Sequence, residues 1–284
     1  MAQVVQLFSN PHAGTYSRKR VQALVRALQD LGATVIQSFS ADAPPEILEG
    51  VDHVCVAGGD GTVRHVASAV LRCGRPVTMS IYPVGTVNLL ARERLYPACA
   101  RRFARMVMAG APDRPHFPVA ADEQFFFACA SVGPDSQALA CYSPRLKRFI
   151  GRAAYGIAFL GLLWHWPRRT IILRAHGNMV ECEAFYVAKG RYYAGPWSLA
   201  PASRADDPLM HVVALKRARR RDFARLALAL LRGRGVDSVP GAVCFTATDL
   251  TAEGDGALPL QADGDIVTAL PVRFAIGGTP LSFR

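Results

Sequence analysis

Glycine, aspartate and threonine gather in one short segment of the chain, Ala57-Gly58-Gly59-Asp60-Gly61-Thr62. The segment follows an apolar run at residues 53–57 and precedes a helical pattern from Val63, so it is expected to join a strand to a helix. Glycines there let the backbone approach an anion closely, and the N–H groups of a helix N-terminus attract phosphate. A lone carboxylate would repel phosphate, so Asp60 is interpreted as organising a metal ion or water. The pattern favours a phosphate-binding turn over an ordinary glycine-rich connection.

Two further polar loops follow predicted strands. One spans residues 9–14, after the apolar run 4–8, and the other spans residues 83–88, after the run 77–82. Ligands of open α/β sheets bind outside the carboxyl ends of the strands, so all three loops are expected at one sheet edge. Asn88 is also expected to cap the helix that follows it. The additional candidate nucleotide-binding residues are Asn10, Pro11, Gly14, Gly85, Thr86 and Asn88.

Strands and helices alternate through the first third of the chain. Strands are predicted at residues 4–8, 34–39, 53–57 and 77–82. The first helix is predicted from Ser17 to Gly32, because its apolar residues recur at helical spacing. Further helices are predicted at 63–71 and from Asn88. This alternation indicates a parallel sheet flanked by helices.

The pattern changes after a proline-rich stretch at residues 112–118. Short β-rich runs then dominate, interrupted by two helical stretches at 155–164 and 221–231. The predicted runs are 125–130, 170–174, 184–188, 210–215, 243–248, 258–261 and 272–276. The expected fold class is α/β in the N-terminal domain, with a C-terminal, mainly antiparallel β-rich domain. The expected boundaries are 1–118 and 119–271, with about 272–284 available to return to the first domain.

Composition indicates a folded protein without a membrane span. Apolar residues make up 51% of the chain and charged residues 19%, enough to bury a substantial core. The start of the chain does not resemble a signal peptide, and the longest apolar candidate, Ala153 to Trp166, is too short to cross a bilayer. The seven cysteines form no CxxC pair, which argues against a zinc site. We expect a cytoplasmic protein.

The formal net charge of +11 calls for an anionic partner or a solvated basic surface. No nucleic-acid-binding signature accompanies the basic clusters, so no nucleic-acid partner is expected. Residues 145–152 are basic and precede the apolar stretch 153–163, which Trp164 and Trp166 follow. That arrangement suits either peripheral contact with an anionic membrane or a core helix with basic ends.

The three loops together resemble the diacylglycerol-kinase catalytic-domain family, which includes bacterial lipid kinases, sphingosine kinases and ceramide kinases. The resemblance continues through Phe125 to Asp135 and Gly190 to Pro201, and closes at Ala262-Asp263-Gly264-Asp265. It therefore covers nearly the whole chain in order. It implies a nucleotide-binding α/β domain, a β-rich second domain and a cleft between them. It also implies transfer of the γ-phosphate of ATP, with Mg²⁺, to a lipid hydroxyl.

The C-terminal motif carries the catalytic assignment. Asp263-Gly264-Asp265 is similar to the family's Asp-Gly-Glu, with Asp265 in place of Glu. The resemblance makes Asp263 the general base and places Asp265 in the nucleotide site. The alternative is a tight hairpin turn, which Asp-Gly between apolar runs commonly forms.

Two positions depart from the family pattern. Close relatives of bacterial diacylglycerol kinase carry one acid where this chain has Leu89. They carry another before the Phe-rich strand, at a position that falls near Pro118 in this chain. Those acids help to hold a magnesium-linked water network. Asp113 and Asp122 are the candidate substitutes, although each also fits a surface loop.

Three hypotheses follow. The first is an ATP-dependent lipid kinase acting on a diacylglycerol, ceramide or sphingoid-type lipid. The second is an NAD kinase, which shares Gly-Gly-Asp-Gly-Thr, and the third is a non-catalytic lipid- or nucleotide-binding module. A homodimer is compatible with each of them.

Overall fold

A computed structural model describes residues 3–11, 16–39, 44–110, 112–140, 168–233 and 235–284. The chain divides into two compact units. The first contains residues up to His116 together with Thr279–Arg284, and the second contains Phe117–Gly278. The apolar candidate span and the basic cluster at 145–152 lie outside the described residues.

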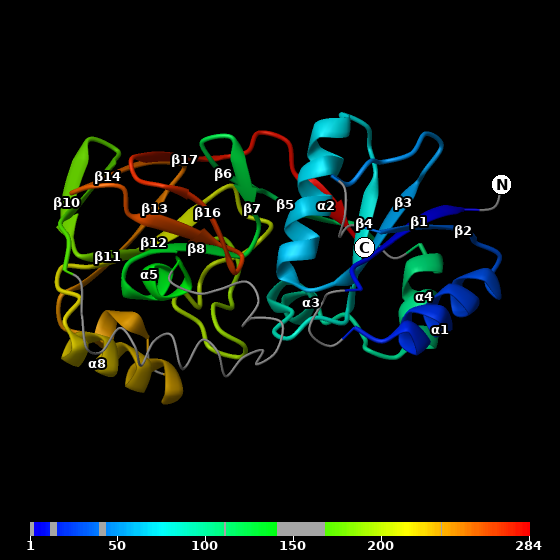
Figure 1. Ribbon diagram of the computed structural model, residues 1–284, viewed down its shortest axis with the longest axis horizontal. Helices are drawn as coiled ribbons and strands as arrows, with labels where there is room; N and C mark the ends of the chain where they lie inside the picture. The colour runs from blue at the N-terminus through cyan, green and yellow to red at the C-terminus, as the bar shows by residue number, and fades with distance from the viewer. Residues whose placement is uncertain (1–2, 12–15, 40–43, 111, 141–167, 234) are drawn as a thin grey trace. The chain divides into compact units, whose positions relative to one another are not determined.

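The first unit is built on one six-stranded sheet with the order β2-β1-β3-β4-β18-β5 (Figure 1). All pairs are parallel except β18 with β5. The strands are β1 Val4–Ser9, β2 Thr34–Phe39, β3 His53–Gly58, β4 Thr78–Pro83, β5 Arg114–His116 and β18 Leu281–Phe283. The helices are α1 Arg18–Gln29, α2 Asp60–Cys73, α3 Leu89–Glu93 and α4 Ala100–Met108. The predicted parallel sheet with flanking helices is confirmed.

Helix α1 shows how the local sequence sets this unit. Ser17 takes the N-cap position, and its Oγ accepts a hydrogen bond from the Arg20 N–H at 3.4 Å. The apolar stripe of the helix, including Leu24 and Leu28, is buried. Because the strand order reverses direction at β1, right-handed crossovers place α1 and α2 on opposite faces of the sheet.

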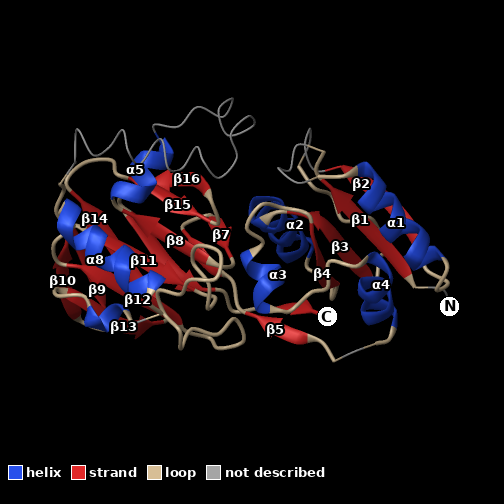
Figure 2. Ribbon diagram, turned by 90° about the horizontal axis from the view of Figure 1, so that it is seen from below, coloured by secondary structure: helices blue, strands red, loops and turns tan. Residues whose placement is uncertain are grey.

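The second unit consists of two six-stranded antiparallel sheets (Figure 2). One sheet has the order β10-β9-β14-β17-β6-β7, with strands β6 Val119–Ala121, β7 Gln124–Phe126, β9 Ile171–Ala175, β10 Asn178–Cys182, β14 Asp249–Gly254 and β17 Val272–Ile276. The other has the order β13-β12-β11-β8-β15-β16, with strands β8 Cys129–Val132, β11 Ala184–Ala188, β12 Met210–Leu215, β13 Ala242–Ala247, β15 Pro259–Ala262 and β16 Asp265–Ala269. The predicted antiparallel β-rich domain is confirmed.

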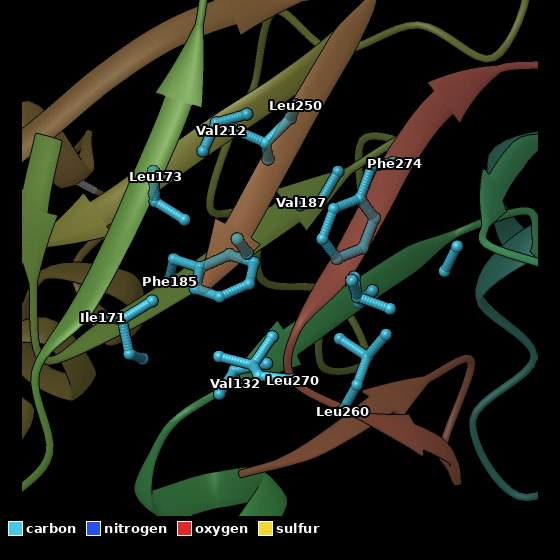
Figure 3. Close-up of a cluster of buried hydrophobic side chains, with 14 of the residues drawn as sticks. Val132, Ile171, Leu173, Phe185, Val187, Val212, Leu250, Leu260, Leu270 and Phe274 are labelled. Carbon is cyan, nitrogen blue, oxygen red and sulfur yellow. The ribbon is translucent and has the colours of Figure 1, made fainter. Parts of the chain in front are cut away.

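A core of buried side chains fills the second unit, as Figure 3 shows. Phe274 on β17 packs edge-to-face against Phe185 on β11, with ring centroids 5.9 Å apart, and against Phe126 on β7, 6.2 Å apart. Among its described residues, this unit also contains the helices α5 Pro134–Ala140 and α8 Arg220–Leu231 and the 3₁₀ turn Val236–Ser238. No helix among the described residues is long and apolar enough to span a membrane.

Candidate active site

Three loops of the first unit meet at one edge of its sheet. They leave β1, β3 and β4, which are neighbours in the sheet and run parallel, so their carboxyl ends lie together. Ser9 pairs with Ala57, and Gly58 pairs with Pro83, which brings the loops into register. The structure therefore brings together most of the predicted phosphate-handling residues, while Gly14 lies outside the described residues.

The glycines of these loops are required by close packing. A Cβ on Gly85 would lie 2.3 Å from the Cα of Gly59, so the two loops contact each other through their backbones. A Cβ on Gly58 would lie 2.6 Å from the Cβ of Thr62. This packing leaves no room for any larger residue at positions 58 and 85.

Two asparagines hold the loops in place. Asn10 donates from Nδ2 to Thr62 Oγ1 at 3.2 Å, which ties the first loop to α2. Asn88 has φ 55° and brackets its own turn: Oδ1 accepts the Gly85 N–H at 2.8 Å, and Nδ2 donates to the Gly85 carbonyl at 2.7 Å. The prediction that the Asn88 side chain caps the next helix is wrong, because both ends of its amide are used by Gly85.

Asp60 supplies that capping interaction. It is the first residue of α2, and its Oδ1 accepts the N–H of Leu90 in the first turn of α3 at 3.2 Å. The carboxylate therefore faces the N-termini of two helices, where negative charge is favourable. Burial nevertheless raises the pKa of Asp60, and hydrogen bonds from the backbone around Leu89 and Leu90 oppose that rise.

Arg20 was missed by the sequence prediction. Its Nη2 donates to the Pro83 carbonyl at 3.0 Å, and its guanidinium lies 5.4 Å from the centre of the Tyr82 ring. These contacts place a cation at the carboxyl end of β4, beside the loop that holds Gly85 and Asn88. The sequence signal for Arg20 was its position in the first turn of α1, the helix that follows the polar loop after β1. Pro11 and Thr86 are exposed at this edge.

In the second unit, Asp263 is buried and fully engaged. Its side chain is 4% exposed, and its carboxylate accepts three backbone N–H groups: Phe127 at 2.8 Å, Ala128 at 2.9 Å and Cys129 at 3.1 Å. Asp263 and Gly264 both have positive φ, 47° and 90°, between Ala262 and Asp265, which pair across the turn. The tight hairpin turn of the alternative interpretation is therefore present, and Asp265 begins the returning strand.

A second buried carboxyl group lies near this turn. Asp135 Oδ2 accepts hydrogen bonds from Ser131 Oγ at 2.6 Å and from the Tyr193 hydroxyl at 2.7 Å. Its Oδ1 is buried without a hydrogen-bond partner among the described residues. Burial raises the pKa of Asp135, which the two donated bonds oppose. The family resemblance through Phe125 to Asp135 ends at this residue, but its partner Tyr193 lies 58 residues away in the sequence.

The candidate substitute acids are occupied elsewhere. Asp113 accepts a hydrogen bond from Thr78, the first residue of β4, and forms an ion pair with Arg284. It therefore lies at the sheet edge opposite the three loops. Asp122 accepts the backbone N–H of Arg273 at 3.0 Å in the second unit. In the described part of the chain, no three acidic, histidine or cysteine side chains are grouped to hold a metal ion.

Comparison with known proteins assigns both units. Residues 4–114 match the diacylglycerol kinase catalytic domain, and residues 128–282 match the YegS C-terminal NAD kinase beta sandwich-like domain. The chain belongs to the diacylglycerol kinase catalytic-domain family. As a member of this family it is a lipid kinase.

Individual relatives agree with this family along most of their length. A "Probable lipid kinase YegS-like" protein of Pseudomonas aeruginosa is 28% identical over 283 residues, covering 93% of this chain and 89% of the relative. The diacylglycerol kinase of Staphylococcus carnosus is 22% identical, covering 96% and 92%. The solved structure of a diacylglycerol kinase from Bacillus anthracis has the same fold, with a TM-score of 0.79 at 18% identity, covering 99% and 96%.

Proposed function

We propose that this diacylglycerol-kinase-family chain transfers the γ-phosphate of Mg-ATP to the hydroxyl group of a membrane lipid. The observation that carries the nucleotide part is the backbone contact between the loops at Gly59 and Gly85, at the N-terminus of α2. Backbone N–H groups at that helix end suit a phosphate, and Arg20 adds a positive charge at the same edge. Phosphoryl transfer depends mainly on such positioning and charge neutralisation.

The residues present are compatible with magnesium that is held largely by water and phosphate. Mg²⁺ commonly binds through one or two carboxylates plus substrate phosphates. Asp60 supplies one carboxylate at the loop edge, and its Oδ1 accepts one backbone hydrogen bond. Mg²⁺, when bound with ATP, would neutralise charge on the transferred phosphoryl group. We assign Asn10, Pro11, Gly14, Gly58, Gly59, Gly61, Thr62, Gly85, Thr86, Asn88 and Asp265 to nucleotide binding, as the sequence predicted.

Asp263 remains our candidate for the base that accepts the proton of the lipid alcohol. Its three N–H partners give it a second role in holding the turn, so activity and stability have to be measured together. We expect Asp263→Asn to lower kcat by roughly two to four orders of magnitude with the Kd for ATP nearly unchanged. A kcat close to wild type in folded protein would leave Asp263 as a turn residue alone.

The activity test uses the full chain, labelled ATP with Mg²⁺, and a panel of lipids in mixed micelles. We expect phosphorylation of at least one diacylglycerol, ceramide or sphingoid base. NAD is included as an acceptor, because phosphorylation of NAD with no lipid product would contradict the proposal. Asp60→Asn is the control that should abolish turnover while weakening the Mg²⁺ dependence of nucleotide binding.

We also infer that the protein works in the cytoplasm at an anionic membrane surface. The net charge of +11 and a lipid substrate support this location. Binding to anionic vesicles should fall as salt rises, because screening weakens the attraction. Equal binding to neutral and anionic vesicles at low salt would contradict the electrostatic part.

A further inference from the structure

Helix α8 buries one face against the second unit. Its 12 residues, Arg220–Leu231, lie across β11 and β12 (Figure 2). Phe223, Leu226 and Ala229 point inward and pack with residues of those strands. This face satisfies the ordinary requirement for an amphipathic helix on a sheet.

The opposite face of α8 is apolar as well. Ala224, Leu228 and Leu231 are exposed and follow one another at i, i+4 and i+7, so they form a ridge along the outside of the helix. Leu228 is 44% exposed and Leu231 is 63% exposed. A helix that serves only its own core carries polar residues on this side. The leucine ridge therefore requires a separate explanation.

Arginines flank the ridge. Arg221, Arg225 and Arg232 are exposed on one side of it and Arg220 is exposed on the other. The single acid of the helix, Asp222, is buried and lies 3.5 Å from Arg225 and 4.0 Å from Arg221. Lys216 and Arg217, just before the helix, add two more exposed cations. The surface consequently combines apolar insertion with strong positive charge.

That combination fits an anionic bilayer surface better than a protein. An interfacial helix buries an apolar face at the headgroup boundary while basic residues contact anionic lipids. Two leucines and an alanine on a convex helix offer far less area than the roughly 1,000 Å² of a specific protein interface. We propose that the outward face of α8 docks on an anionic lipid bilayer, with Leu228 and Leu231 inserted and the arginines on lipid phosphates. This rests on the proposed function in so far as the substrate resides in that bilayer.

A second basic surface provides the comparison. Helices α1 and α4 pack together and expose Arg18, Lys19 and Arg26 with Arg101, Arg102 and Arg105, and neither helix contains an acid. These helices expose no large apolar residue. If charge alone drove binding, α4 would matter as much as α8.

The test measures co-sedimentation of the full chain with phosphatidylcholine vesicles that contain phosphatidylglycerol, without nucleotide or lipid substrate. We expect the double variant Leu228→Ser/Leu231→Ser to lower the partition coefficient about tenfold or more. Arg221→Gln/Arg232→Gln should lower it by a similar factor and reduce its salt dependence. Met179→Ser removes a side chain of 64% exposure from β10 and should bind like wild type. Arg101→Gln/Arg102→Gln on α4 matches the charge change and should have a smaller effect than the α8 arginine pair.

Unchanged vesicle binding in the leucine variant would overturn the proposal, as would an equal loss in Met179→Ser. A wild-type dimer in vesicle-free sedimentation equilibrium that the leucine variant converts to monomer would overturn it in favour of a second copy of the chain. Kinase activity on detergent-dispersed lipid should be retained in the α8 variants. Absence of that activity in the wild type, with α8-dependent binding intact, would contradict the proposed function and support the docking surface.

Discussion

The same dipeptide, Asp-Gly, has different surroundings in the two units. Asp60-Gly61 opens α2 beside two other strand-end loops, and the Asp60 carboxylate accepts a backbone N–H of α3. Asp263-Gly264 forms a hairpin turn, and the Asp263 carboxylate is enclosed by three backbone N–H groups of residues 127–129. The Asp60 carboxylate links the N-terminus of α2 to the first turn of α3. The Asp263 carboxylate holds the turn between β15 and β16 against residues 127–129.

The energetic difference is as instructive as the geometric one. Burial raises the pKa of Asp60, so ionising it works against folding. The Asp263 carboxylate instead accepts hydrogen bonds from three buried backbone N–H groups. We therefore expect substitution of Asp263 to lower stability more than substitution of Asp60 does. The variants below test this contrast.

The largest loss of stability is expected for Asp263→Ala. It leaves three buried N–H groups without the carboxylate, so the free energy of unfolding should fall by roughly 3–5 kcal/mol. Trp197 lies within the described part of the second unit, so its fluorescence during urea unfolding reports on that unit. Asp255→Asn, at an exposed acid in the nearby loop, is the control and should change stability by less than about 0.5 kcal/mol. Equal stabilities for the two variants would show that the three hydrogen bonds accepted by Asp263 do not stabilise the fold.

Gly85→Ala should come next. Its Cβ would meet the Gly59 backbone at 2.3 Å, so the loops must move apart at a cost of roughly 1–3 kcal/mol. The Kd for ATP should rise by at least tenfold if the loops bind phosphate. Gly278→Ala, with open space around the added methyl group, is the matched control. ATP binding at wild-type strength in Gly85→Ala would separate loop packing from nucleotide binding.

Asp60→Asn should have a small effect on stability despite its large effect on turnover. The amide oxygen can still accept the Leu90 N–H, and the lost interaction with helix dipoles is worth up to about 1 kcal/mol. Because burial raises the pKa of Asp60 and so disfavours its charged form, we expect the thermal stability of the variant at neutral pH to lie close to that of wild type. A marked fall in the free energy of unfolding of this variant would mean that Asp60, like Asp263, is required for stability, and would contradict the contrast between them.

Asp135→Asn should change the pH dependence of the free energy of unfolding more than its size at a single pH. The raised pKa of Asp135 means that its stabilising contribution is full below the pKa of the unfolded chain and is lost as pH rises through the folded value. An amide does not titrate, so the stability of the variant should fall less than that of wild type as pH rises through this range. Urea midpoints measured from acidic to neutral pH check this. Parallel curves would show that Asp135 does not titrate with folding.

Local patterns predicted many elements well. The bounds of β2, β12 and β17 agree with the expected runs to the residue, because alternation or continuous burial marks them clearly. Helix α4 was missed: it has nine residues and buries only Phe103, Ala104 and Val107, so its stability depends on packing against α1. The strand predicted at 125–130 is two strands, β7 and β8. Its interruption is fixed by the Asp263 carboxylate, more than 130 residues away, which no local pattern contains.

In the candidate site, too, local features could be predicted from the sequence, whereas contacts between separate segments could not. The glycine loops could be predicted because their residue types and their position after parallel strands are local facts. The bracket that Asn88 forms around Gly85, the bond from Asp60 to Leu90 and the pair Asp135–Tyr193 depend on contacts across loops or strands. Those contacts determine which oxygen atoms remain available for a ligand.

The return of the chain to the first unit affects how the protein is made. Strand β18, residues 281–283, inserts between β4 and β5, after the whole of the second unit has been synthesised. Residues 117–278 can therefore form their own strand pairs before β18 is available to the sheet of the first unit. Until then β4 and β5 present unpaired edges, which are prone to wrong pairing. Residues 279–284 therefore complete the sheet of the first unit, because β18 is the strand that joins β4 to β5.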